Sequence, residues 1–155
     1  MALKLTSTAF SNGADIPTKY TCDGADVSPA LSWSGAAQGT RSFALIADDP
    51  DAPSGTFTHW VLYAISATTT QSPEGLPKNE QTEVGRQGRS GFGRVGYGGP
   101  CPPPGKPHRY FFKLFALDTD LTLAPGASRA DLERAMKGHV LDQSEWMGRY
   151  QRKSH

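Results

Sequence analysis

The sequence predicts a mainly β protein with antiparallel strands and one or two helices near its C-terminus. Apolar runs whose side chains alternate with period two are typical of strands, and the 17 glycines and 12 prolines supply many turns. The connections between the runs are too short for the crossover helices that parallel strands need. The length of 155 residues fits a single domain, residues 1–155, with a sizeable core.

Five segments have the pattern of strands. Two short strands are expected at residues 3–7 and 30–33. Three longer strands are expected at residues 41–47, 58–65 and 108–117, where aromatic and β-branched residues are frequent. We expect the three long strands to lie side by side.

The first two long strands each carry a polar side chain at or near one end. Asp49 continues the apolar face of the first strand just beyond its end. In the second strand, regular alternation is expected to place His59 on the face of Val61, Tyr63 and Ile65. Both side chains stand beside the turn that joins the two strands.

The third long strand begins with a histidine and a tyrosine two residues apart. Alternation places His108 and Tyr110 on the same face as Phe112 and Leu114. If the strand ends gather at one edge of the sheet, these two residues join Asp49 and His59.

A glycine-rich segment at residues 84–99 runs into a proline-rich segment at residues 100–107. A flexible linker is one interpretation. The aromatic and β-branched residues among the glycines favour the other, a loop with a function, because long loops inside compact domains are usually functional.

The C-terminal part predicts helices. Ser128 is a suitable N-cap with Asp131 three residues later, and Gly138 is expected to end the helix. A second short helix is expected at residues 143–150. Both predictions rest on local patterns alone.

Composition argues against several classes of partner and location. Sixteen basic and 15 acidic residues give a net charge of +1, so no nucleic-acid partner is expected. No apolar stretch is long enough to span a membrane and no secretory signal opens the chain, which predicts a cytoplasmic protein. Two buried thiols are therefore expected at Cys22 and Cys101, with a disulfide between them as the alternative.

Four polar side chains form the predicted site. Asp49, His59, His108 and Tyr110 would offer one carboxylate, two imidazoles and a phenol at one end of the sheet. Imidazole and phenol donors near glycine amides suit an anion such as phosphate or a carboxylate. Asp49 is expected to accept a hydrogen bond from one ring nitrogen of a histidine and so fix its tautomer.

Neighbouring residues of the turn have supporting roles in this interpretation. Asp51 is expected to cap the turn rather than touch a ligand, and Pro53 to stiffen it. Asp48 is interpreted as a solvated charge at the strand end.

Several motifs resemble one known family. The sequences DPDAP (residues 49–53), THW (residues 58–60) and GGPCPPPGKPHRYFFKLFALD (residues 98–118) are similar to those of the phosphatidylethanolamine-binding protein family, also called the Raf kinase inhibitor protein family. The resemblance is to its prokaryotic branch, and it extends over YTCDGADVSPALSW (residues 20–33) and MKGHVLDQSEWMGRY (residues 136–150).

The resemblance implies a Greek-key β-sandwich of two antiparallel sheets with an anion pocket at one end. By position in the motifs, it implies that the pocket side chains are Asp49, His59, His108 and Tyr110. Pro53 and the turn at Gly99 and Pro100 would line its walls. Ser90 and Gly91 stand where close prokaryotic relatives often carry Asn-Asp. The tail is shorter than in the eukaryotic branch of the family, so the resemblance only weakly implies lipid-head-group binding or Raf inhibition for this chain.

These features predict a non-enzymatic protein that binds a small anion or a phosphorylated small molecule and modulates a kinase or protease partner. No cofactor and no metal are expected, and homodimers occur among similar proteins. Two alternatives remain open: a metal-dependent or acid/base hydrolase that uses Asp49, His59 and His108, or a protein interaction module with a vestigial pocket.

Overall fold

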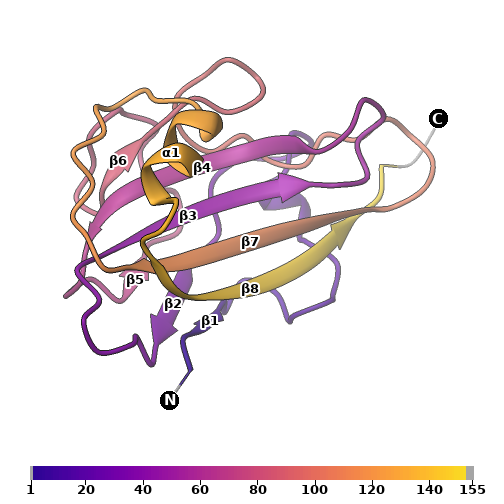
Figure 1. Cartoon of the computed structure of the whole chain (residues 1–155). Coiled ribbons are helices and arrows are strands. Elements are labelled where there is room, and N and C mark those ends of the chain that lie inside the picture. The colour runs from indigo at the N-terminus through magenta and orange to yellow at the C-terminus, as the bar shows by residue number, and fades with distance from the viewer. Residues whose placement is uncertain (1, 153–155) are drawn as a thin grey trace.

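The computed structural model describes residues 2–152 and contains two antiparallel sheets and one α-helix (Figure 1). The strands are β1 (Lys4–Thr6), β2 (Leu31–Ser34), β3 (Ser42–Asp49), β4 (Phe57–Ser66), β5 (Gln71–Ser72), β6 (Arg86–Gln87), β7 (His108–Leu117) and β8 (Val140–Tyr150). The helices are a short 3₁₀ turn, η1 (Thr18–Tyr20), and α1 (Arg129–Met136). The mainly β, two-sheet antiparallel class and the five predicted strands are confirmed.

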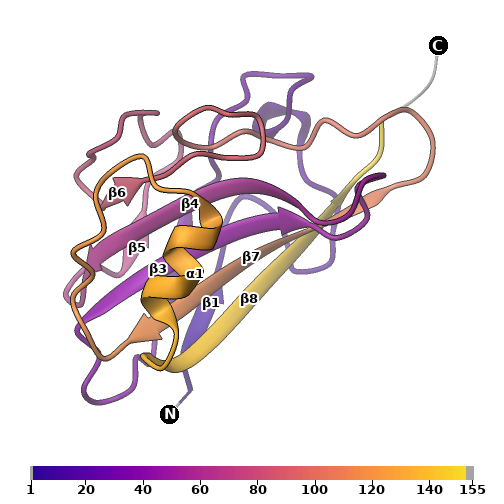
Figure 2. The ribbon, with the colours of Figure 1, turned by 45° about the horizontal axis from the view of Figure 1, so that its top comes forward.

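The two sheets and α1 form layers. One sheet has the strand order β1-β2-β5, and the other has the order β6-β4-β3-β7-β8. Figure 2 shows α1 on the face of the larger sheet that points away from the smaller one. The larger sheet is therefore buried on both faces at its centre, and all eight residues of β3 are buried.

Two apolar clusters fill the spaces between the layers. The cluster between the sheets is built around large side chains such as Trp33, Phe43, Leu45, Phe112 and Leu114. The cluster under α1 includes Ile46, Val61, Tyr63, Leu132 and Met136. Burial of such side chains is the dominant favourable contribution to folding, at roughly 1.5–3 kcal/mol for each fully buried side chain.

The expected alternation along β4 is wrong, because two irregularities interrupt its pairing with β3. At each of them β4 advances by one residue more than β3, at His59 and near Ala64, whose φ is +54°. Val61 and Tyr63 face α1, whereas Ile65 lies in the core between the sheets. His59 packs against the inter-sheet side of the larger sheet, so the bulge directs it away from Val61 and Tyr63.

Helix α1 forms as the sequence predicts. Ser128 Oγ accepts a hydrogen bond from Asp131 N at 3.1 Å, and Asp131 Oδ2 accepts one from Ser128 N at 3.3 Å. Gly138 follows the C-cap with φ +83°, a conformation that glycine adopts readily. Within residues 2–152, no helix is long and apolar enough to cross a membrane.

The second predicted helix, at residues 143–150, is wrong, since this segment belongs to strand β8. β8 pairs with β7 along its whole length, from His108 opposite Tyr150 to Leu117 opposite Val140. It has no apolar alternation because its inward positions are polar at Asp142 and Ser144. These two side chains accept hydrogen bonds from the backbone N–H groups of Leu3 and Leu5, at 2.9 and 3.0 Å, and so connect β8 to the smaller sheet.

Candidate functional site

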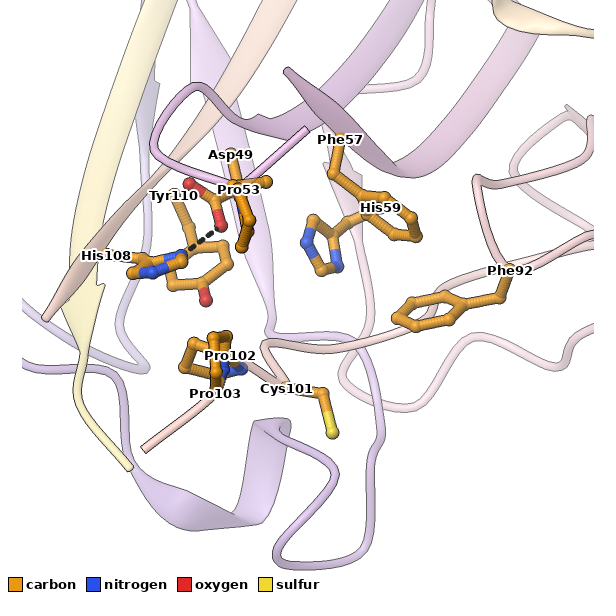
Figure 3. A pocket seen from close by; sticks show the side chains of 11 residues that line it. Asp49, Pro53, Phe57, His59, Phe92, Cys101, Pro102, Pro103, His108 and Tyr110 are labelled. Carbon is orange, nitrogen blue, oxygen red and sulfur yellow. Dashed lines mark hydrogen bonds and ion pairs between the residues drawn. The ribbon is translucent and has the colours of Figure 1, made fainter. Parts of the chain in front are cut away.

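A cavity of about 140 Å³ lies where the ends of β3, β4 and β7 meet two loops (Figure 3). The β3–β4 turn forms one wall and the proline-rich segment before β7 forms another. The lining residues are Asp49, Ala52, Pro53, Phe57, His59, Phe92, Cys101, Pro102, Pro103, His108 and Tyr110. The structure therefore brings together the four polar side chains that the sequence singled out.

Asp49 and His108 form a buried pair in this cavity. His108 Nδ1 donates a hydrogen bond to Asp49 Oδ2 at 2.7 Å, and the backbone N–H of Asp51 donates to Asp49 Oδ1 at 2.7 Å. Only 4% of the Asp49 side chain and 11% of the His108 side chain are exposed. Because a carboxylate only accepts, the Nδ1 proton is fixed and Nε2 is the ring nitrogen left for another partner.

His59 is held by the glycine-rich segment rather than by a carboxylate. Its Nδ1 donates to the Gly98 carbonyl oxygen at 2.7 Å, and the Gly98 N–H donates to the His59 carbonyl oxygen at 2.9 Å. Burial lowers the pKa of His59 below its ordinary value of 6.5. The hydrogen bond to the Gly98 carbonyl and the charge of Asp49 both favour a higher pKa, but the effect of burial is larger. At neutral pH the ring is therefore uncharged, with a lone pair on Nε2.

Tyr110 carries the one side-chain oxygen of this cavity that is buried without a hydrogen-bond partner within residues 2–152. Burial raises the pKa of Tyr110 far above its ordinary value, and the charge of Asp49 adds to the effect. The phenol thus keeps its proton and is a donor. Figure 3 shows the hydroxyl directed toward the space between His108 and the prolines at 102 and 103.

Aromatic rings surround His59 and complete the cavity. The ring centroids of Phe57 and Tyr110 lie 4.9 and 5.2 Å from that of His59, in edge-to-face arrangements. Phe92, from the glycine-rich segment, lies 5.5 Å from His59 and is 45% exposed. These contacts fix the orientation of the imidazole and give the cavity apolar walls.

The supporting residues predicted from the sequence lie in different places. Pro53 lines the cavity. Gly99 lines a neighbouring cavity and donates its N–H to Asp26, and the Pro100 carbonyl accepts from Cys22 N.

Asp51 lies outside the cavity. It accepts hydrogen bonds from the backbone and the guanidinium of Arg109, all at 2.9 Å, and this contact lowers the pKa of Asp51 to about 2. It thereby fixes the turn to the start of β7, a role that turn patterns alone do not reveal.

The expectation that Asp48 is a solvated charge is wrong. Asp48 is 1% exposed and its Oδ2 accepts from Lys113 Nζ at 3.1 Å and Arg129 Nη1 at 2.8 Å. Because successive side chains of a strand point to opposite faces, Asp48 points toward α1 while Asp49 points into the cavity.

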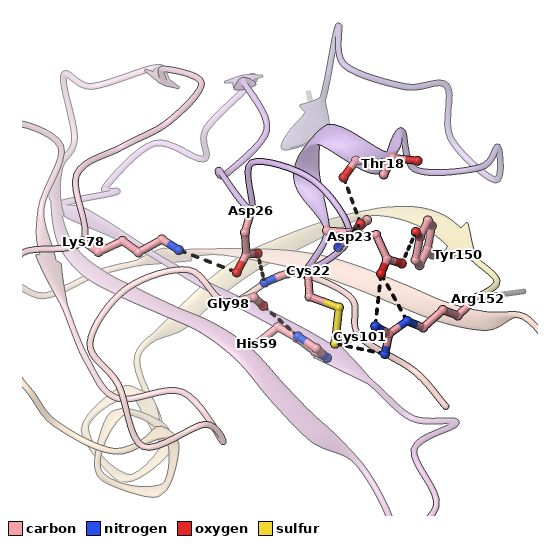
Figure 4. Close-up of a disulfide and its surroundings, with 12 residues drawn as sticks. Thr18, Cys22, Asp23, Asp26, His59, Lys78, Gly98, Cys101, Tyr150 and Arg152 are labelled. Carbon is pink, nitrogen blue, oxygen red and sulfur yellow. Dashed lines mark hydrogen bonds and ion pairs between the residues drawn. A yellow bond between two sulfur atoms is a disulfide. The ribbon is translucent and has the colours of Figure 1, made fainter. Parts of the chain in front are cut away.

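The expectation of two free thiols is also wrong, since Cys22 and Cys101 form a disulfide (Figure 4). Their Cα atoms are 5.4 Å apart, within the usual range for a disulfide. Cys101 is exposed at the rim of the cavity and Cys22 is half-buried. The bridge fastens the proline-rich wall to the segment after η1.

Sequence reasoning missed the aromatic walls at Phe57 and Phe92 and the contribution of Cys101, Pro102 and Pro103. The prolines in the segment were the only signal for this wall. Within the described range, no cluster of three or more His, Cys, Asp or Glu side chains is arranged to hold a metal ion.

Comparisons with known proteins agree on one family. A sequence model described as phosphatidylethanolamine-binding protein matches residues 6–151. A UPF0098 protein of Aquifex aeolicus is 53% identical over 97% of this chain and 89% of its own, and one of Pyrococcus horikoshii is 52% identical over 99% and 78%.

Solved structures give the same result. A crystal structure from Chlamydia trachomatis, titled as that of a putative phosphatidylethanolamine-binding protein homolog, has a TM-score of 0.89 and 38% identity over 98% of this chain and 99% of its own. Escherichia coli YbcL, described as a member of the mammalian family, has a TM-score of 0.91 and 34% identity over 99% of this chain and 100% of its own.

Proposed function

Because the chain belongs to the phosphatidylethanolamine-binding protein family, we propose that it is a non-enzymatic protein that binds a phosphate group or a similar small anion in the cavity around Asp49, His59, His108 and Tyr110. The observation that carries this proposal is the buried Tyr110 hydroxyl without a partner. A buried unsatisfied donor costs roughly 1–3 kcal/mol, which a ligand acceptor would recover.

The remaining polar groups of the cavity support the same ligand class. The inner nitrogens of His59 and His108 are occupied by Gly98 and Asp49, so each ring has only Nε2 for a ligand. A monoprotonated phosphate can accept from Tyr110 and donate its own proton to the neutral His59 ring.

The cavity volume limits how much of a ligand can enter. At about 140 Å³ it is well below the roughly 300–1,000 Å³ of sites that enclose drug-sized molecules. A phosphate or carboxylate group is small enough for a cavity of about 140 Å³, and the rest of a phosphorylated molecule would extend outside it.

Titration with inorganic phosphate tests the proposal by NMR. We expect phosphate to shift the signals of His59, His108 and Tyr110, and a Tyr110→Phe variant to bind at least about fivefold more weakly, the loss of about one hydrogen bond. Tyr150→Phe is the matched control, because the Tyr150 hydroxyl bonds Asp23 outside the cavity. Absence of all three shifts at tens of millimolar phosphate would refute the proposal.

We extend the proposal to modulation of a protein partner, a kinase or protease, through a phosphate or carboxylate that the partner carries. A pull-down from native lysate with wild-type and His59→Ala baits tests this, and capture of the same partner in equal amount by both baits would contradict it. The partner would then recognise another surface, as in an interaction module with a vestigial pocket. An Asp49→Ala, His108→Ala double variant that retains the partner would support that alternative.

A hydrolase remains the second candidate, and the Asp49–His108 pair is the observation that favours it. A carboxylate that orients an imidazole is the arrangement of a general base. Hydrolysis of a phosphate or carboxylate ester that disappears in His108→Gln, or stoichiometric metal in the purified protein, would support this candidate instead.

The predicted cytoplasmic location is opposed by the Cys22–Cys101 disulfide. Disulfides persist mainly in oxidising compartments, although intracellular proteins of hyperthermophiles are an exception. Fractionation of the native cells would decide between the two locations.

A further inference from the structure

A second cavity adjoins the one around Tyr110 and shares two lining residues with it, Phe92 and Cys101. Its volume is about 370 Å³, and its other lining residues include Asp26, Lys78, Arg94 and Val95. An apolar cavity of about 150 Å³ is enough to hold a benzene molecule, so an aromatic ring fits here. Figure 4 shows Lys78, Asp26 and the disulfide around this region, with His59 beside Gly98.

The charges of the second cavity favour an electron-rich or negatively charged group. Lys78 and Arg94 contribute two cations against the single carboxylate of Asp26. That carboxylate already accepts from the Gly99 N–H at 2.7 Å, and its contact with Lys78 Nζ is long, at 3.8 Å. Both cations are exposed and can turn toward a ligand.

Phe92 and Cys101 line both cavities, and the Gly98 backbone, whose carbonyl accepts a hydrogen bond from His59, also lies between them. Phe92 stands edge-to-face against Phe57, with 4.7 Å between ring centroids, and is 45% exposed. An exposed phenyl ring on a loop can change rotamer on the nanosecond scale. A ligand whose phosphate lies beside Tyr110 therefore meets an apolar surface at Phe92 and the disulfide as it leaves the first cavity.

We infer that the second cavity binds the aromatic ring of an aryl phosphate monoester whose phosphate group lies in the first cavity. This inference rests on the proposed function. The ring would pack on Phe92 and Val95 and lie within reach of the Arg94 guanidinium, a contact of the cation–π type. The phosphate would occupy the donors of the first cavity as before.

Two phosphate monoesters distinguish the cavities, because methyl phosphate fills only the first and phenyl phosphate spans both. By calorimetry at pH 7.5 we expect phenyl phosphate to bind about tenfold more tightly, the gain from five additional carbon atoms in contact. In NMR titrations, both compounds should shift His59 and Tyr110, and only phenyl phosphate should shift the amides of Val95 and Gly96.

Variants of the second cavity supply the controls. Val95→Trp fills it and should reduce the preference for phenyl phosphate to less than about twofold while methyl phosphate still binds. Arg94→Gln should weaken phenyl phosphate alone by about threefold. Arg89→Gln is the matched control, an exposed arginine of the same segment that lines neither cavity. If Val95→Trp does not fold, the comparison of Arg94→Gln with Arg89→Gln decides.

The outcomes separate this inference from the proposed function. Equal affinities for the two esters, with no shift at Val95 or Gly96, would overturn the inference and leave the phosphate site intact. Shifts of Val95 and Gly96 without shifts of His59 and Tyr110 would overturn the idea of one ligand across both cavities. No shift from either ester would overturn the inference together with the proposed function.

Discussion

Removal of the Cys22–Cys101 disulfide is expected to destabilise the protein strongly. The two cysteines are separated by 79 positions in the sequence, so the bridge closes a long loop in the unfolded chain. In the chain-entropy treatment, a loop of this length corresponds to about 15 cal/mol/K, or about 4.5 kcal/mol at 25 °C. Native disulfides typically contribute about 2–4 kcal/mol, and we expect a loss within about 2–4.5 kcal/mol.

The loss should also reach the cavity, because few other bonds hold its proline-rich wall. Near the bridge, Cys22 N donates to the Pro100 carbonyl at 3.0 Å, and further along Gly105 N donates to the Arg152 carbonyl at 3.2 Å. Between these points, the disulfide at Cys101 is a covalent cross-link between the wall and the segment after η1. We therefore expect weaker phosphate binding in the same variant.

Guanidinium unfolding measures the effect in four samples: the wild-type protein and a Cys22→Ser, Cys101→Ser double variant, each with and without dithiothreitol. The oxidised wild type should exceed the other three in free energy of unfolding, and the double variant should not respond to the reductant. A cross-linked unfolded chain is more compact, so the oxidised wild type should also have the smallest m-value. Equal stability of oxidised and fully reduced wild type, with thiols counted by mass spectrometry, would refute this account.

Three further predictions concern charges and caps. Asp48→Asn removes a buried carboxylate between two cations and should cost about 3 kcal/mol in urea unfolding; an unchanged midpoint would show that Asp48 contributes nothing. Since burial lowers the pKa of His59 and an anion favours the protonated ring, sulfate affinity should be highest at acidic pH and fall as the pH rises through that pKa. His59→Gln should abolish this dependence and His139→Gln, at an exposed site, should retain it; a flat profile in wild type would contradict the role of His59. Ser128→Ala removes the helix cap and should lower the thermal midpoint by an amount equivalent to about 1 kcal/mol, whereas no shift would show that the cap is not needed.

The strands that could be predicted from the sequence are those that bury apolar side chains at alternate positions. β7 has the bounds predicted for it because Tyr110, Phe112 and Leu114 all enter the core between the sheets. β8 could not be found in this way, since the side chains at its inward positions, Asp142 and Ser144, bond the backbone of β1. These inward polar side chains contact a strand of the other sheet 139 positions away in the sequence, so a local pattern does not reveal them.

The residues of the candidate site likewise fall into two groups, those that the strand pattern could predict and those that it could not. Asp49, His108 and Tyr110 could be predicted together because they lie at neighbouring ends of paired strands. The orientation of His59 depends on a bulge, which an alternating pattern does not encode. Phe92 reaches the cavity through a long loop whose path is set by tertiary contacts, so local patterns do not place it.

Three acids, Asp48, Asp49 and Asp51, lie at the end of β3 and in the turn that follows it. Each acid has a different partner: Asp48 pairs with cations from β7 and α1, Asp49 with His108, and Asp51 with Arg109. Together they fix the end of β3 against the start of β7 and against the helix. A slip of β3 by one residue in one direction would put Asp48 in the cavity and Ala47 opposite the cations. A slip in the other direction would put Asp49 opposite the cations and Pro50 beside His108, so either slip leaves one partner without a carboxylate. Two adjacent carboxylates, one for each face of β3, therefore favour the register in which Asp49 meets His108 and Asp48 meets Lys113 and Arg129.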